Sequence, residues 1–297
     1  MNKLLFIYNP MSGKGRVGEG LSMILDEFTR NGWLTTAYPT QCRGDAARLA
    51  REAGPDFDRV ICAGGDGTLS EVVSGLMELE KPPLLGYLPF GSTNDCATTL
   101  NLPRNPLEAA HVASLSGVPR PSDIGALNGK PFVYVAAFGA FTQVAYATPQ
   151  DMKNAFGHLA YIMEGIASLP TISPFHMKVE YEGNVIEDNF YFGMVTNALS
   201  IGGMKTVKRE HVILDDGLFE VNLVKKPVSL MDVADGFSSL LAPGVVSGGS
   251  LVHFQASRIK FTCDRSVPWT IDGEFGGEQE INEVVNHRKA LNIVRGG

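Results

Sequence analysis

The sequence predicts an α/β protein of two domains, and three observations lead to this class. Over the first part of the chain, short apolar stretches alternate with amphipathic helical stretches, which is the pattern of βαβ units around a parallel sheet. After about Asp123 one strand-like stretch follows another, which indicates an antiparallel β domain with helical insertions. The chain has 297 residues, 44% of them hydrophobic, and so exceeds the usual size of a single core. The composition changes near Pro121–Ala126 without a linker, so we expect the domains to pack closely.

The first part of the chain alternates predicted strands and helices. Apolar runs of strand length predict strands near 4–8, 34–39, 59–63 and 84–88. Apolar residues at helical spacing predict helices near 16–31, 45–53, 68–78, 95–100 and 106–115. Because helices separate the strands, the strands are expected to form a parallel sheet.

The second part of the chain consists mostly of predicted strands. Runs rich in apolar residues predict strands near 132–138, 177–181, 190–196, 218–224, 259–262 and 268–271. Helical spacing occurs in two stretches, near 153–168 and 229–241. These two stretches are the predicted helical insertions.

Glycine-bearing polar loops follow three of the predicted strands. They are Asn9–Gly15, Gly64–Thr68 and Pro89–Asp95. The carboxyl ends of parallel strands meet at one edge of a sheet, where open α/β folds bind ligands. Glycines at a strand-to-helix turn let backbone N–H groups approach a phosphate, the helix N-terminus adds partial positive charge, and a carboxylate such as Asp66 can hold Mg2+. A single Gly-Gly-Asp-Gly turn is often only a tight connection. The three loops together predict a nucleotide site.

The overall charge and hydropathy exclude several classes of protein. A formal net charge of −7 argues against a broad nucleic-acid-binding face and against purely electrostatic docking to anionic lipid. No apolar run approaches the roughly 20 residues of a transmembrane helix, and the N-terminus resembles a strand rather than a signal peptide. We therefore expect a cytoplasmic protein. The cysteines lack C-x-x-C spacing and are predicted to be free thiols: Cys42, Cys62, Cys96 and Cys263.

The loops also carry a family resemblance. With their motifs, and with Ile271-Asp272-Gly273-Glu274 near the end, the chain resembles the diacylglycerol kinase catalytic family, which is distantly similar to NAD kinases and phosphofructokinases. The resemblance implies a three-layer nucleotide-binding α/β domain, followed by an antiparallel β-sandwich domain. We expect the first domain over 1–124 and the second, which would hold the lipid substrate, over 125–286. The resemblance further implies that a last strand, about 287–297, returns to the first domain.

Phosphoryl transfer requires a cradle for the donor phosphates, a divalent cation, a base and a place for the acceptor. Small residues and backbone amides of the first two loops fit the cradle, and the resemblance implies that Thr40 and Ser92 also touch the nucleotide. The family usually has threonine where Ser92 stands, and serine keeps the hydroxyl. The predicted nucleotide-binding residues are Asn9, Pro10, Ser12, Gly13, Thr40, Gly64, Gly65, Asp66, Gly67, Thr68, Ser70, Gly91, Ser92 and Asn94.

Two carboxylates of the first domain are candidates for catalysis. Asp66 is predicted to handle the magnesium–nucleotide complex. Asp95 is either a second carboxylate at the same site or an N-terminal cap of the helix that it opens. The sequence leaves both readings of Asp95 open, and one carboxylate can serve both.

In the second domain, the resemblance places Glu274 where the family has its proposed catalytic base. Glutamate free in water has a pKa of about 4.3, so useful basicity needs partial burial or a nearby negative charge, which Asp272 could provide. From the residues alone, Asp272-Gly273 is a common centre of a hairpin turn.

The Asp215-Asp216-Gly217 segment has two interpretations as well. By spacing it is an ordinary Asp-Gly turn before a strand. The resemblance implies a structural magnesium held by the Asp216 side chain and the carbonyls of Ile213 and Leu218, which are hard oxygen ligands. Whether Asp215 takes part is left open.

These observations lead to one functional hypothesis. The resemblance implies an ATP- and Mg2+-dependent lipid kinase that converts diacylglycerol to phosphatidic acid, in transient peripheral contact with the inner membrane face. The alternatives are a kinase for a sphingoid base, an isoprenoid alcohol, another glycerolipid or a soluble metabolite, or a regulatory nucleotide-binding protein that has lost its chemistry. No nucleic-acid partner is expected, and a homodimer is left open.

Overall fold

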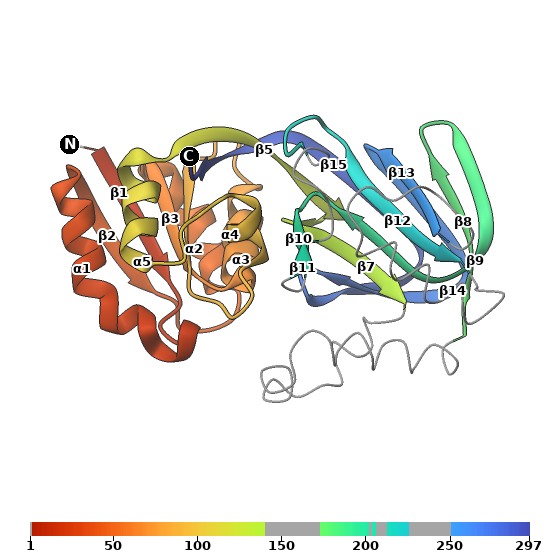
Figure 1. The fold of residues 1–297 in the computed structure, drawn as a ribbon, viewed down its shortest axis with the longest axis horizontal. Coiled ribbons are helices and arrows are strands. Elements are labelled where there is room, and N and C mark those ends of the chain that lie inside the picture. The colour runs from red at the N-terminus through yellow and green to blue at the C-terminus, as the bar shows by residue number, and fades with distance from the viewer. Residues whose placement is uncertain (1, 140–172, 202–203, 206–212, 226–250) are drawn as a thin grey trace. The chain divides into compact units, whose positions relative to one another are not determined.

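The computed structural model describes residues 2–139, 173–201, 204–205, 213–225 and 251–297. The chain divides into two units (Figure 1). Unit 1 comprises Met1–Ile124 together with Arg288–Gly297, and unit 2 comprises Gly125–His287. The long strands β5 (Val118–Leu127) and β15 (Glu274–Arg295) each contribute residues to both units. Among the described residues, no helix is long and apolar enough to span a membrane.

Unit 1 contains a parallel sheet in the order β4-β3-β1-β2. Its strands are β1 (Asn2–Tyr8), β2 (Trp33–Pro39), β3 (Arg59–Gly64) and β4 (Leu84–Pro89). The end of β15 pairs parallel with β4, with Ile293 opposite Leu85. Since Tyr8 lies opposite both Pro39 and Ala63, and Gly64 opposite Pro89, the strands end level with one another. The loops that follow them therefore leave from one edge.

Helices cover both faces of this sheet. Alternate residues of the strands, such as Phe6 and Ile61, pack against α1 (Arg16–Arg30) and α5 (Pro106–His111). The intervening residues point to the opposite face because side chains alternate along a strand, and they are buried too: Leu5, Ile7, Val60 and Cys62. On that face α2 (Asp45–Ala53) contacts β1, and α3 (Asp66–Leu76) contacts β3. The result is a three-layer α/β arrangement.

Unit 2 is built from antiparallel strands in the order β13-β12-β9-β7-β14-β15. The longer strands are β7 (Val135–Gly139), β8 (Phe175–Tyr181), β9 (Asn184–Thr196), β12 (Phe219–Lys225), β13 (Leu251–Ala256) and β14 (Arg258–Ile271). Short strands are β6 (Lys130–Phe132), β10 (Ser200–Ile201) and β11 (Met204–Lys205).

The two longest central strands of unit 2, β9 and β14, each pair with two neighbouring strands along their length. β9 pairs with β8 over its first half and with β7 over its second half, and β14 pairs with the same two strands in the same order. The pairing of β14 with β15 shifts register between Thr262 and Val267, which bends the strand. Trp269 and Phe138 pack between the layers with ring centroids 4.8 Å apart, and Phe261 lies 5.1 Å from Trp269. Together with the register shift, this packing gives a β-sandwich.

The predicted fold class is confirmed, with differences in detail. The predicted strands near 259–262 and 268–271 are one bulged strand, β14, and β15 is far longer than the predicted final strand. The helix predicted near 106–115 ends at His111 and continues as a π-helical turn, Val112–Ser116. The sequence analysis missed β5 and β13. The helical stretches near 153–168 and 229–241 lie outside the described residues.

The α2–α3 contact depends on a glycine. A Cβ at Gly75 of α3 would overlap the carbonyl oxygen of Ala47 and lie 3.0 Å from the Cβ of Ala50. Both neighbours belong to α2, and the nearer atom is backbone, so neither can move without shifting the helix. The two helices are therefore packed at a distance that only glycine allows.

We expect Gly75→Ala to lower the free energy of unfolding by about 1–3 kcal/mol, because the added methyl overpacks a backbone contact. The matched control is Gly18→Ala in α1, where an added Cβ meets nothing within 4 Å. This control should gain up to about 1 kcal/mol from the higher helix propensity of alanine. Urea denaturation of both variants measures the difference, and equal stabilities would contradict the packing argument.

Candidate functional site

Loops at the carboxyl edge of the unit 1 sheet are joined to one another by backbone hydrogen bonds. The Asn9 N–H donates to the Ala63 carbonyl (2.9 Å), the Phe90 N–H to the Gly64 carbonyl (2.8 Å), and the Thr40 N–H to the Tyr8 carbonyl (2.9 Å). The loops after β1, β2, β3 and β4 are thus neighbours. The sequence predicted this convergence for three of them.

The Asn9 side chain shapes the loop after β1. The Asn9 Oδ1 accepts the Met11 N–H at 2.9 Å, and the Asn9 carbonyl accepts the Ser12 N–H at 3.1 Å. Gly13 has a φ of 62°, in the left-handed region that favours glycine. Asn9, Pro10, Ser12 and Gly13 are partly exposed, so this loop presents polar groups to solvent at the sheet edge.

In the loop after β3, glycines permit close backbone approach. A Cβ at Gly64 would overlap the Thr68 side chain, and a Cβ at Gly91 would lie 2.9 Å from the Gly65 Cα. The Gly64 carbonyl also accepts the hydroxyl of the buried Tyr87 at 3.2 Å. Burial, and secondarily the negative charge of Asp66, raise the pKa of Tyr87 and keep its phenol protonated as a donor. Tyr87 thus holds the loop through the Gly64 carbonyl. The sequence analysis did not predict this role, because Tyr87 lies in an apolar strand.

The loop after β4 is closed by a reciprocal pair of hydrogen bonds. The Asn94 Oδ1 accepts the Gly91 N–H, and the Asn94 Nδ2 donates to the Gly91 carbonyl, both at 2.7 Å. Asn94 itself has a φ of 54°, a conformation that asparagine tolerates better than most residues. Ser92 is exposed between Gly91 and Asn94, so its hydroxyl is accessible to a ligand.

Asp66 connects two of these loops. Its Oδ2 accepts the Asp95 N–H at 3.2 Å and its Oδ1 accepts the Cys96 N–H at 3.3 Å. These donors belong to the first turn of α4 (Asp95–Thr99), so a side chain from the start of α3 meets the N–H groups that open α4. Asn94, not Asp95, occupies the N-cap position, and Asp95 is 2% exposed. The structure thus brings the predicted Asp66 and Asp95 together through a side chain-to-backbone contact.

In unit 2, Asp272 and Gly273 form the turn between β14 and β15. Their φ angles of 49° and 82° are both left-handed, as in a type I′ hairpin, and Ile271 pairs with Glu274. The Asp272 carboxylate is buried and accepts the N–H groups of three residues that lead into β7: Val133 (2.8 Å), Tyr134 (3.0 Å) and Val135 (3.2 Å). The hairpin is therefore fixed to the neighbouring strand, and it holds Glu274 at an exposed position beside Phe275.

The Asp215–Gly217 segment forms a turn that leads into β12. The Asp216 Oδ1 accepts the Leu218 N–H at 2.9 Å, and Gly217 has a φ of 91°. Across the described residues, no group of three or more His, Cys, Asp and Glu side chains could hold a metal ion. The ligand set implied by the family resemblance differs in kind, because it combines one carboxylate with two backbone carbonyls. Such oxygens suit Mg2+ chemically.

Comparison with known proteins places the chain in a family. Residues 3–127 match the model of the diacylglycerol kinase catalytic domain, and residues 135–295 match that of the YegS C-terminal NAD kinase beta sandwich-like domain. The chain belongs to the diacylglycerol kinase family of lipid kinases. The resemblance drawn from the motifs is thereby confirmed.

Relatives within the diacylglycerol kinase family match the chain over nearly its whole length. A diacylglycerol kinase of Bacillus subtilis is 34% identical over 295 residues, 99% of this chain and 96% of the relative. One from Staphylococcus carnosus is 32% identical over 277 residues, 93% of this chain and 90% of the relative. A crystal structure of a Bacillus anthracis diacylglycerol kinase has a TM-score of 0.79 at 23% identity and covers 99% of this chain and 97% of that one, which supports the fold.

We expect Asp272→Asn to destabilise this diacylglycerol kinase family member by about 2–4 kcal/mol. An asparagine amide would turn a donor toward N–H groups that now meet a carboxylate, and buried donors without an acceptor are costly. Asp264→Asn, an exposed position on β14, is the control and should change stability by less than about 0.5 kcal/mol. Chemical denaturation compares the two, and equal losses would contradict the anchoring role of Asp272.

Proposed function

We propose that this protein is an ATP- and Mg2+-dependent kinase that phosphorylates diacylglycerol to phosphatidic acid. The observation that supports the proposal most is the set of glycine-bearing loops at one sheet edge, which the Asp66 carboxylate ties together. The relatives named diacylglycerol kinase, at 32–34% identity over most of the chain, support the choice of acceptor.

In this proposal the nucleotide phosphates lie against the loops of unit 1. Exposed N–H groups and hydroxyls at a strand-to-helix turn can bind phosphate oxygens, and the start of α3 adds partial positive charge. Thr40 and Ser92 would contribute hydroxyls from the loops after β2 and β4. The remaining contacts would come from Asn9, Pro10, Ser12, Gly13, Gly64, Gly65, Asp66, Gly67, Thr68, Ser70, Gly91 and Asn94.

Two proposed roles involve Mg2+. Asp66 and Asp95 would hold the cation that accompanies the nucleotide, since their chain segments are already in contact. When bound, such an ion neutralises charge on the transferred phosphoryl group. Asp216, with the carbonyls of Ile213 and Leu218, would hold a structural ion where the turn enters β12.

Glu274 is the proposed general base. Its carboxylate would take the proton from the acceptor hydroxyl while that oxygen forms a bond to the γ-phosphorus and the bond to the β-phosphate oxygen breaks, which releases ADP. Asp272 would act on Glu274 by fixing the hairpin through the N–H groups of Val133, Tyr134 and Val135.

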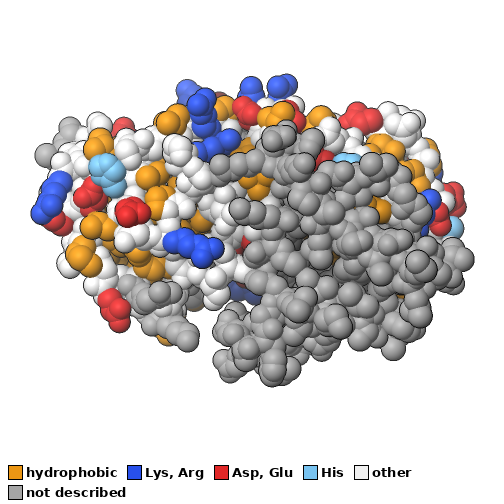
Figure 2. Space-filling view, in the orientation of Figure 1, with side chains coloured by type: hydrophobic (Ala, Val, Ile, Leu, Met, Phe, Trp, Pro, Cys, Tyr) orange, Lys and Arg blue, Asp and Glu red, His pale blue; other side chains and the backbone are white. Residues whose placement is uncertain are grey.

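The acceptor determines where the protein works. Diacylglycerol resides in membranes, so we propose a cytoplasmic protein that contacts the inner membrane face transiently. Figure 2 shows basic, acidic and apolar side chains interspersed on the described part of one face, which fits transient contact better than a nucleic-acid-binding surface.

The test is transfer of labelled γ-phosphate from MgATP to micellar diacylglycerol, monoacylglycerol, sphingosine and isoprenoid alcohol. We expect labelled phosphatidic acid, and Glu274→Gln should lower kcat by about 10²–10⁴-fold because a positioned base is lost. Glu278→Gln, an exposed position on the same strand, should leave kcat unchanged. Asp66→Asn should also abolish turnover.

Other results of this assay would indicate a different acceptor or a different function. Label in a different lipid would replace the acceptor, and label in none, from folded protein that binds MgATP, would favour a soluble acceptor or a regulatory nucleotide-binding role. A fully active Glu274→Gln variant would remove Glu274 from the chemistry.

A further inference from the structure

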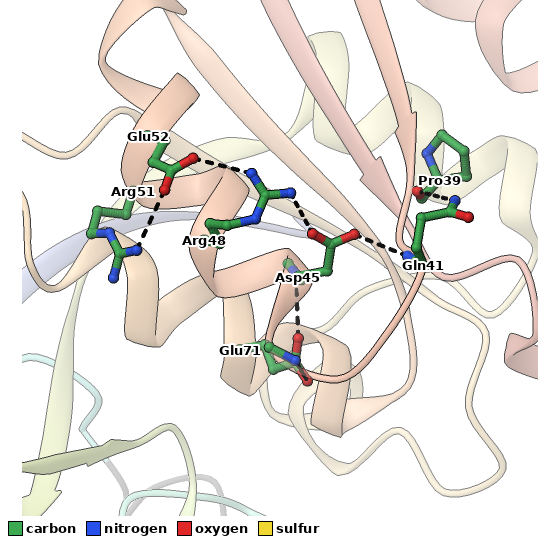
Figure 3. Close-up of polar contacts among 9 residues, drawn as sticks. Pro39, Gln41, Asp45, Arg48, Arg51, Glu52 and Glu71 are labelled. Carbon is green, nitrogen blue, oxygen red and sulfur yellow. Dashed lines mark hydrogen bonds and ion pairs between the residues drawn. The ribbon is translucent and has the colours of Figure 1, made fainter.

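Glu71 of α3 holds a loop that belongs to a different strand–helix connection. Its Oε1 accepts the Gly44 N–H at 2.9 Å and its Oε2 accepts the Ala46 N–H at 3.3 Å (Figure 3). Gly44 and Ala46 lie where the loop after β2 enters α2, and Thr40 is at the start of that loop. The helix that begins at Asp66 therefore also anchors the loop that carries Thr40.

Two carboxylates, those of Asp45 and Glu71, hold this loop in its conformation. Gly44 is the N-cap of α2, has a φ of 84° and offers no side chain to cap the helix. Asp45 accepts the Gln41 N–H at 2.9 Å and pairs with Arg48, as Figure 3 shows. The Gln41 N–H, followed by the Arg48 guanidinium, lowers the pKa of Asp45 and keeps it ionised. Asp45 thus shapes the loop internally, whereas Glu71 attaches it to α3.

The α2–α3 pair makes this attachment rigid. Gly75 allows the two helices to touch at Ala47, and at the far end of the pair the Arg51 guanidinium lies 3.3 Å from Glu78. Residues 41–46 can therefore move only if the hydrogen bonds to Glu71 break, because separating the two helices would lose their close packing. At its other end the loop is fixed by the Thr40 N–H on the Tyr8 carbonyl.

We propose that Glu71 is a positioning residue for the nucleotide: it sets residues 40–46 relative to the Asp66 loop without touching the ligand. The inference rests on the proposed function, in which Thr40 and Asp66 contact the same nucleotide. The Glu71 carboxylate accepts the N–H groups of Gly44 and Ala46, which belong to the loop itself, so in this proposal its contribution to nucleotide binding acts through the loop. Loss of this contact weakens MgATP binding and leaves the chemical step intact.

Glu71→Gln tests the inference, because glutamine keeps one acceptor oxygen and turns an NH2 group toward the other N–H. We expect the Kd for MgATP, measured by calorimetry without lipid, and the KM for MgATP to rise about tenfold, with kcat at saturation within twofold of the unchanged chain. Hydrogen exchange at Gly44 and Ala46 should accelerate. The control Glu78→Gln removes an ion pair between α2 and the turn that follows α3, and it should change none of these values.

A second variant alters the loop itself and leaves Glu71 in place. Gly44→Ala strains the backbone at a φ of 84°, where an added Cβ meets nothing within 4 Å, and leaves Glu71 unaltered. It should raise the Kd and KM for MgATP in the same manner.

The outcomes separate this inference from the proposed function. If the unaltered protein binds no MgATP, the proposed function fails, while the exchange rates still report whether Glu71 holds the loop. If it binds MgATP but neither variant changes the Kd, or if Glu71→Gln lowers kcat at an unchanged Kd, the positioning role of Glu71 is wrong.

Discussion

The contact between the Asp66 carboxylate and the first N–H groups of α4 is the interaction on which the unit 1 site depends. It joins the loop after β3 to the loop after β4, because its donors are the N–H groups of Asp95 and Cys96. A carboxylate near a helix N-terminus is favoured by both hydrogen bonding and the helix dipole. The same charge that would face a magnesium–nucleotide complex therefore also holds the loops in register.

In both units, polar side chains hold loop backbone in place through hydrogen bonds. The Gly64 carbonyl meets Tyr87, the Asn94 amide closes on Gly91, and the Asp272 carboxylate meets three N–H groups. Such hydrogen bonds, of which those to the Asp272 carboxylate are charge-assisted, reduce the freedom of the loops that carry them. A kinase gains from such loops because phosphoryl transfer relies on positioning and electrostatic stabilisation more than on covalent chemistry by the protein.

The carboxylates proposed for catalysis differ in their surroundings. Asp95 and Asp272 are buried, with 2% and 5% of their surface exposed, whereas Glu274 is exposed at the end of a hairpin. Because Glu274 is exposed, a role for it as a base relies on the substrate excluding water around it. Asp272 instead accepts three backbone N–H groups and so holds its hairpin in place before any ligand binds.

The sequence by itself determined the fold class, the strand-to-helix order of unit 1 and the loops that meet at its sheet edge. Those features follow from local apolar periodicity and from glycine-bearing turns, which neighbouring residues encode. The pairing of Ile293 with Leu85, the link from Glu71 to Gly44, and the support of Gly64 by Tyr87 were decided by tertiary structure. These contacts join residues far apart in the chain, and a carboxylate that accepts a backbone N–H leaves no pattern in the sequence of its partner. The expected three-layer order and sandwich, and the proposed roles of Glu274 and Asp216, came from family resemblance, since an Asp-Gly turn has the same local signature whether or not it carries chemistry.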